Sequence, residues 1–179
     1  MINQLYIERA LFVVGLQNTG KSTQLRSMLA DPRFGANGRT ASSKRIKIIQ
    51  LSNERNLYIR LSSPHESRLT PQKFIRGIQS RMRAGRWCFA GALHPKPLNK
   101  MPDAAESIAL FQDKFNVERI RVCFLSPDKR GQWLNENEEI RIEGLLRHLR
   151  KIGNVECMFI DARSRKANSL LLSDFFDFS

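Results

Sequence analysis

The sequence predicts an α/β protein with three layers: a mostly parallel sheet, flanking helices on both faces, and one antiparallel hairpin strand. Three observations favour this class. Short apolar runs alternate along the chain with amphipathic segments at helical spacing. Several of these runs are continuous, which is typical of parallel strands that are covered on both faces. The first run is followed by a glycine loop and then directly by a helix.

The N-terminal part of the chain contains this first strand, loop and helix. The strand is predicted over 10–14, and the helix over 21–30, where apolar residues recur at helical spacing. Segment 31–43 is rich in glycine and small polar residues, so a mobile loop is expected there. Two short alternating runs, 45–51 and 57–61, flank a polar turn and predict the hairpin.

The remaining chain continues the alternation of helices and strands. Thr70 and Pro71 predict a helix start, because Thr suits the N-cap and Pro the first helical position. Further elements are predicted as strands over 86–93, 119–125 and 155–160, helices over 103–115 and 135–151, and an apolar helix or tail over 170–178. No repeat or second domain is evident, so residues 1–179 are expected to form one domain.

Charge is the clearest feature of the composition. The 30 Lys and Arg residues exceed the 17 Asp and Glu residues, giving a formal net charge of +13 and a pI of about 10.4. Such a protein attracts polyanions, so a nucleic acid or an acidic protein is an equally good candidate partner. Neither a Cys/His finger nor an aromatic-interleaved RNA motif accompanies the charge.

Cysteine usage and hydropathy bear on location. Cys88, Cys123 and Cys157 are odd in number and widely spaced, and each falls within a predicted strand. They are therefore expected to be buried thiols in a reducing compartment. No apolar run reaches the length needed to span a bilayer, and the N-terminus lacks a charged segment before an apolar one. A cytoplasmic location without membrane contact is expected.

The segment Gly15-Leu16-Gln17-Asn18-Thr19-Gly20-Lys21-Ser22-Thr23 fits the pattern G-x-x-x-x-G-K-[ST]. Gly15 and Gly20 allow backbone angles that let successive N–H groups point at phosphate oxygens, and the following helix adds a partial positive charge. The motif resembles the phosphate loop of P-loop NTPases. That resemblance implies their fold, a bound nucleoside triphosphate (ATP or GTP) and Mg²⁺. It implies nucleotide contacts from Gly15, Gln17, Asn18, Thr19, Gly20, Lys21, Ser22 and Thr23.

Within this resemblance two residues carry the chemistry. Lys21 would reach the β- and γ-phosphates, and the Ser22 hydroxyl would be a Mg²⁺ ligand. Thr40 lies where Ras-like GTPases, which the order of elements also resembles, carry a metal-binding loop threonine. The alternative for Thr40 is an ordinary exposed loop residue.

The Ras-like resemblance lacks two further motifs. The second hairpin strand ends in Leu61-Ser62-Ser63-Pro64-His65-Glu66 instead of D-x-x-G. The strand over 119–125 is followed by Ser126-Pro127-Asp128-Lys129 instead of the guanine-reading N/T-K-x-D. Guanine specificity is therefore unsupported, and ATP is favoured over GTP.

A second resemblance is to nucleotide kinases of the thymidylate-kinase type. Gly20-Lys21-Ser22-Thr23-Gln24 is similar to their loop, and Phe159-Ile160-Asp161-Ala162-Arg163-Ser164 is similar to their last strand and adenine-side loop. This resemblance implies base contacts from Asp161 and Ala162, and it implies that Arg130 acts with Lys21 in catalysis. A surface role is the alternative for Arg130. Where these kinases have Asp-Arg, the strand over 86–93 ends in Leu93-His94.

Several candidates for site residues stay open on the sequence alone. His94 follows a strand, at the edge where doubly wound sheets bind ligands, but a structural role is the alternative. No carboxylate stands at the end of a central strand, where it could support the metal. Asp161 and Asp128 are the candidates for that role, and a turn-forming role is the alternative for Asp128. Lys73, Arg76 and Arg83 would share one helix face. This face would either be solvated or bind a polyanion.

These observations predict a protein that binds a Mg²⁺–nucleoside triphosphate. Because both sets of secondary motifs are incomplete, hydrolysis or phosphoryl transfer is expected to be weak, specialised or dependent on a partner. The alternative is a non-enzymatic, GTPase-like nucleotide switch, or a subunit of a larger assembly. In that case the basic face over Lys73, Arg76 and Arg83 would bind nucleic acid or an acidic protein.

Overall fold

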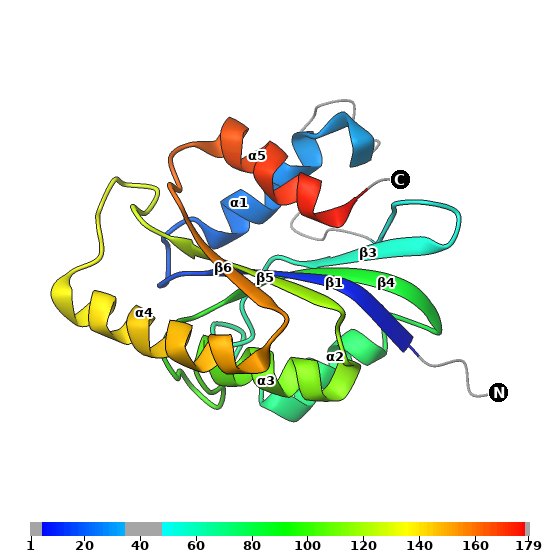
Figure 1. Ribbon diagram of the computed structural model, residues 1–179, viewed down its shortest axis with the longest axis horizontal. Helices are drawn as coiled ribbons and strands as arrows, with labels where there is room; N and C mark the ends of the chain where they lie inside the picture. Colours follow the sequence, from blue (N-terminus) through cyan, green and yellow to red (C-terminus); the bar gives the residue numbers. More distant parts are fainter. Residues whose placement is uncertain (1–4, 35–47, 178–179) are drawn as a thin grey trace.

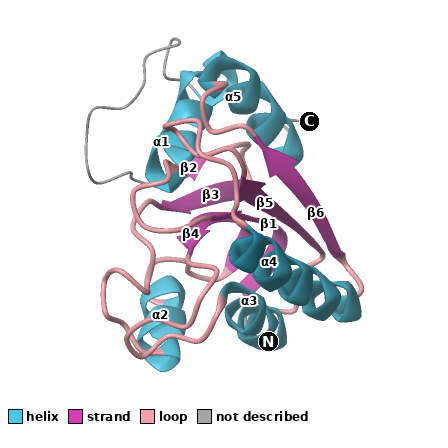
Figure 2. Cartoon of the chain, turned by 90° about the vertical axis from the view of Figure 1, so that its left-hand side faces the viewer, coloured by secondary structure: helices cyan, strands magenta, loops and turns pink. Residues whose placement is uncertain are grey.

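A computed structural model describes residues 5–34 and 48–177. Six strands form one sheet in the order β2-β3-β4-β1-β5-β6 (Figures 1 and 2). All neighbouring strands are parallel except β2 and β3, which are antiparallel. The strands are β1 (Leu5–Val14), β2 (Ile49–Gln50), β3 (Arg55–Arg60), β4 (Gly85–Leu93), β5 (Arg119–Leu125) and β6 (Val155–Ile160). The predicted α/β class with a mostly parallel sheet and one antiparallel pair is thus confirmed.

Helices cover both faces of the sheet (Figure 1). On one face lie α1 (Lys21–Ser27) and α5 (Arg165–Ser173), and on the other lie α2 (Pro71–Gln79), α3 (Ala104–Phe115) and α4 (Glu136–Leu149). Short 3₁₀ turns over 28–30, 32–34, 150–152 and 174–176 extend or follow the helices. None of the described helices is long and apolar enough to cross a membrane.

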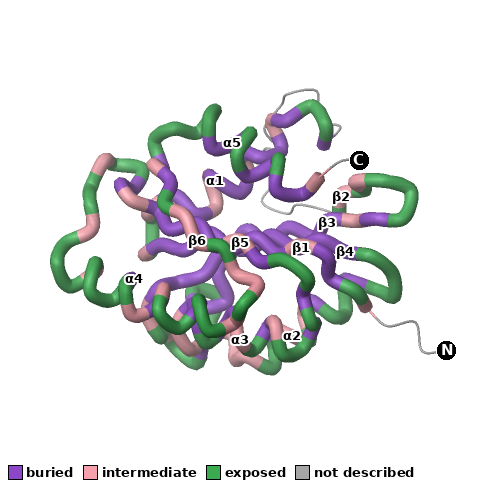
Figure 3. The backbone as a smooth tube through the Cα atoms, in the orientation of Figure 1, coloured by how far each residue is buried: buried purple, intermediate pink, exposed green. Residues whose placement is uncertain are grey.

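Strand β1 lies inside the sheet, and its side chains pack into the hydrophobic cores on both faces. Phe12 and Val14 face the cluster under α2, α3 and α4, whereas Leu11 and Val13 face the cluster under α1 and α5. Figure 3 shows β1 and β4 buried along most of their length, whereas the edge strand β6 is largely half-buried or exposed. A continuous apolar run is what a strand buried on both faces requires.

Helix ends follow the capping signals in the sequence. Thr70, Asp103 and Asn135 each accept a hydrogen bond from the backbone N–H three residues later, and Asn135 and Glu138 form a complete capping box. Helix α2 ends at Gln79, so Arg83 lies beyond it and does not share a helix face with Lys73 and Arg76. That part of the prediction was wrong.

Two other expectations need correction. The first strand begins at Leu5 instead of residue 10, because Glu8 is paired with Arg55 and Arg86 and so fits inside the sheet. Cys88 and Cys123 are buried as predicted, but Cys157 is only half-buried, since β6 is an edge strand. Thr40 and the first hairpin run up to residue 47 lie outside the described residues.

Candidate functional site

The loop over 15–23, called here the glycine loop, lies at the carboxyl end of β1, where neighbouring strands lead into helices on opposite faces of the sheet. Strand β1 leads into α1 on one face, whereas its neighbours β4 and β5 lead into α3 and α4 on the opposite face. Adjacent strands whose connections leave on opposite faces open a crevice at their carboxyl ends, where α/β sheets bind ligands. The glycine loop follows β1 at that crevice.

The backbone of the glycine loop needs its glycines. At Gly15 a Cβ atom would come within 2.5 Å of the Thr19 hydroxyl oxygen and 3.3 Å of a Leu125 methyl group. Gly20 has a φ of +112°, a conformation that other residues rarely adopt. Asn18 also has a positive φ, of 63°. The loop is therefore tightly wound, with Gln17 and Asn18 exposed at its tip.

Lys21 is the buried charge of the site. Its side chain is 4% exposed, and its ammonium donates to the Leu16 carbonyl at 2.7 Å and to the Glu66 carboxylate at 2.8 Å. Burial lowers the pKa of Lys21 below its usual value, and the bond to Glu66 opposes that shift. The next residue, Ser22, is half-buried and donates its hydroxyl hydrogen to the Leu61 carbonyl at 2.9 Å, while Thr23 is half-buried in the first turn of α1.

Two histidines flank this pair, with ring centroids 5.8 Å apart. Nε2 of His65 lies 2.5 Å from the Pro102 carbonyl, which can only accept, so this nitrogen carries the hydrogen and Nδ1 accepts from the Ser63 hydroxyl at 3.2 Å. Burial lowers the pKa of His65 to about 4 and also lowers that of His94. Both rings are therefore neutral at pH 7.

His94 directly follows β4, the strand beside β1, and the Gly15 N–H donates to the Leu93 carbonyl at 3.3 Å. The prediction that His94 lies at the carboxyl edge of the sheet is confirmed, although it is not a lone histidine. Its Nδ1 contacts the Lys96 backbone, with 3.2 Å to the nitrogen and 3.1 Å to the oxygen.

The loop after β6 reaches the other side of the glycine loop. Gln24, at the start of α1, is fully buried and donates to the Ala162 carbonyl at 2.7 Å. Asn168 donates to Gln24 at 2.9 Å and to the Asp161 carbonyl at 2.7 Å. Ala162 is thus brought to the site, whereas the Asp161 carboxylate bonds Arg163 in its own turn.

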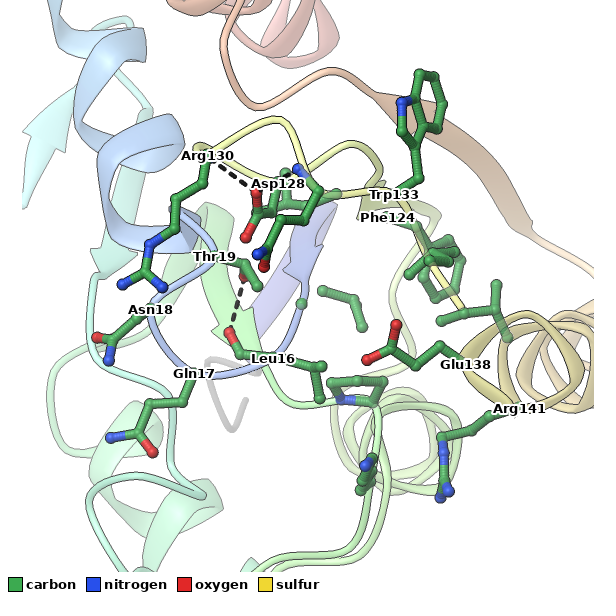
Figure 4. A pocket seen from close by; sticks show the side chains of 18 residues that line it. Leu16, Gln17, Asn18, Thr19, Phe124, Asp128, Arg130, Trp133, Glu138 and Arg141 are labelled. Carbon is green, nitrogen blue, oxygen red and sulfur yellow. Dashed lines mark hydrogen bonds between the residues drawn. The ribbon is translucent and has the colours of Figure 1, made fainter. Parts of the chain in front are cut away.

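The loop after β5 completes the surroundings of the glycine loop. Its Lys129 N–H donates to the Thr19 carbonyl at 3.0 Å. The Asp128 carboxylate accepts from the backbone N–H groups of Arg130 and Gln132, so its turn-forming role is confirmed. Arg130 is exposed, and Figure 4 shows its side chain extending toward Asn18.

A pocket of about 170 Å³ adjoins the glycine loop on the side of α4 (Figure 4). Its lining includes the apolar or aromatic residues Leu16, Phe124 and Trp133 and the polar or charged residues Asn18, Arg130 and Arg141. Trp133 is 70% exposed. A second recess is lined by Lys129 and residues 162–167.

The sequence prediction missed Glu66 and Gln24 as site residues. Glu66 follows β3 in a segment without a recognisable motif, and only the order of strands brings it to Lys21. Lys73, Arg76 and Arg83 are exposed and make none of these contacts. No protein-family model, curated protein or solved structure matches the chain significantly.

Proposed function

We propose that this protein binds a Mg²⁺–nucleoside triphosphate in the glycine loop, with ATP favoured over GTP. The observation that carries the proposal is the buried ammonium of Lys21 at the base of a loop wound through Gly15 and Gly20. Lysine is rarely buried unless an anion compensates it. Here the compensating carboxylate comes from a half-exposed side chain, which an incoming phosphate can replace.

The residues around the loop are compatible with Mg²⁺ held jointly with a nucleotide. Ser22 gives its hydroxyl hydrogen to Leu61, so the oxygen lone pairs stay available to a cation. Within residues 5–34 and 48–177 no cluster of three or more Asp, Glu, His or Cys residues could cage a metal alone. Mg²⁺ is commonly bound by few protein groups together with phosphate oxygens and water, and it would neutralise charge on the phosphates.

Hydrolysis or phosphoryl transfer is proposed to be weak, specialised or dependent on a partner. Catalysis of this kind needs cations and an oriented nucleophile around the transferring group. Strand β4, the neighbour of β1, ends at Leu93 and is followed by His94, which cannot act as a metal-supporting carboxylate. Arg130, which lines the adjoining pocket, is the candidate for a mobile catalytic cation.

The binding proposal is tested by calorimetry with ATP and GTP, each with and without Mg²⁺, while phosphate release is followed in the same samples. Lys21→Ala should weaken binding of Mg²⁺–ATP about 30-fold or more, because a charge-assisted contact is lost. Lys114→Ala removes an exposed lysine of α3 and should leave binding unchanged. Unchanged affinity in Lys21→Ala, or no binding by the wild type, would refute the proposal.

A second candidate function is favoured by exposed basic residues on α2 and after its end. Lys73, Arg76 and Arg83 are exposed and take part in no ion pair within the described part of the chain. Solvated basic side chains without acidic neighbours suit a polyanion. In this alternative the protein is a nucleotide switch or subunit that binds nucleic acid or an acidic protein.

A further inference from the structure

The segment after β3 contacts two consecutive residues of the glycine loop, Lys21 and Ser22. Ser22 donates to the Leu61 carbonyl, and Lys21 donates to the Glu66 carboxylate, at 2.9 and 2.8 Å respectively. Both residues that the proposed function assigns to the phosphates and the metal therefore already contact segment 61–66. Glu66 is the carboxylate that this segment brings to them.

The backbone beside Glu66 is held firmly in place. His65 is fully buried, its ring donates to the Pro102 carbonyl, and its own carbonyl accepts from the Asn99 side chain at 2.7 Å. The Ser67 N–H donates to the Ser63 carbonyl at 3.0 Å. Glu66 therefore emerges from a fixed point, while its side chain, 29% exposed, keeps room to rotate.

An incoming phosphate would compete with Glu66 for the same ammonium. Two anions cannot share one buried cation without repulsion, so the carboxylate must move when phosphate binds Lys21. Its negative charge would then be uncompensated, on a segment whose Leu61 carbonyl already contacts Ser22. A divalent cation that also contacts phosphate oxygens removes that repulsion, and carboxylate oxygen is a preferred Mg²⁺ ligand.

We propose that Glu66 pairs with Lys21 in the free protein and with the nucleotide's Mg²⁺ in the loaded protein. This inference rests on the proposed function of the glycine loop. Glu66 thereby supplies the carboxylate that is missing at the end of β4. It also makes tight nucleotide binding depend on the metal, because without Mg²⁺ the displaced carboxylate repels the phosphates.

The test compares wild type with Glu66→Gln, using calorimetry with a nonhydrolysable ATP analogue in EDTA and in excess Mg²⁺. In EDTA the variant should bind about tenfold more tightly, because the competing charge is gone. The gain in affinity on adding Mg²⁺ should be about tenfold smaller than in the wild type. Glu143→Gln removes an exposed carboxylate of α4 and should behave as the wild type.

A direct metal measurement separates the two roles of Glu66. Mn²⁺ replaces Mg²⁺, and its bound fraction in the presence of the analogue is followed by electron paramagnetic resonance. Glu66→Gln should weaken Mn²⁺ binding about tenfold, whereas Glu143→Gln should not. If the wild type binds the analogue but Glu66→Gln shows the same metal dependence, the role of Glu66 is refuted while nucleotide binding stands. If neither protein binds the analogue under any condition, the proposed function fails and this inference with it.

Discussion

His65 shows how one buried side chain fixes the segment that carries Glu66. Its ring is neutral and joins Ser63 to Pro102, two residues on different loops. Burial holds its pKa at about 4, below the value of 6.5 expected in the unfolded chain. Between these values the unfolded chain binds a proton that the folded protein does not. Stability from this group is therefore complete above about pH 6.5 and is lost as the pH falls toward 4.

We expect the free energy of unfolding to fall by about 1 to 2 kcal/mol more in the wild type than in His65→Gln between pH 6.5 and 5. Glutamine retains a polar side chain but does not titrate, so carboxylate titration cancels in the comparison. Urea unfolding at several pH values measures both slopes. Identical slopes in the two proteins would show that the ring is free to accept a proton when folded.

Residues of the site differ in how far the sequence alone reveals them. Gly15, Gly20, Lys21 and Ser22 stand within eight positions of one another, so local spacing was enough to predict the loop. Glu66 lies 45 residues from its partner Lys21. Only the order β3-β4-β1 in the sheet brings the two together, and no local pattern encodes that order of strands.

At the scale of elements, Gln24 connects α1 to the loop after β6. It is fully buried, its amide donates to the Ala162 carbonyl, and its oxygen accepts from Asn168. Replacing it by leucine keeps the volume roughly similar but leaves the Ala162 carbonyl, in a residue that is 1% exposed, without this donor. An unsatisfied buried polar group costs about 1–3 kcal/mol.

Gln24→Leu should therefore lower the free energy of unfolding by about 2 kcal/mol, as measured by urea denaturation. The matched control is Gln79→Leu at the exposed end of α2, where the change should stay within about 0.5 kcal/mol. Equal stability of Gln24→Leu and the wild type would mean that α1 and the loop after β6 are not coupled through this side chain.

The elements themselves were predicted best where a short apolar-rich run ends at turn-forming residues, or where a helix start carries a capping residue. The bounds of β5 and β6 match the prediction, and α3 and α4 begin one residue after the predicted starts, Asp103 and Asn135, which cap them. The first half of β1 was missed because Glu8 and Arg9 interrupt the apolar run. Both are accommodated by long-range partners, Arg55 and the Phe175 carbonyl, which no local pattern predicts.

At the scale of the whole molecule, the net charge of +13 raises the question of whether the basic residues act together or only keep the protein soluble. The two possibilities differ in salt dependence. Each phosphate contact made by a basic side chain releases counterions, so the logarithm of affinity falls linearly with the logarithm of salt concentration. A specific face predicts that particular residues carry this slope, whereas a diffuse field predicts dependence on total charge alone.

Reversing Lys73, Arg76 and Arg83 to glutamate should therefore weaken binding to a single-stranded oligonucleotide and reduce the salt slope by about 2, since each contact contributes about 0.7. The control reverses Lys100, Lys114 and Lys151, which are also exposed, for the same change in net charge. Fluorescence anisotropy at about 50 to 300 mM salt measures the affinity and the salt slope, because such contacts weaken over roughly this range. A specific basic face requires a larger loss in the first variant than in the control. Equal losses would assign the attraction to net charge and remove the case for a dedicated polyanion site.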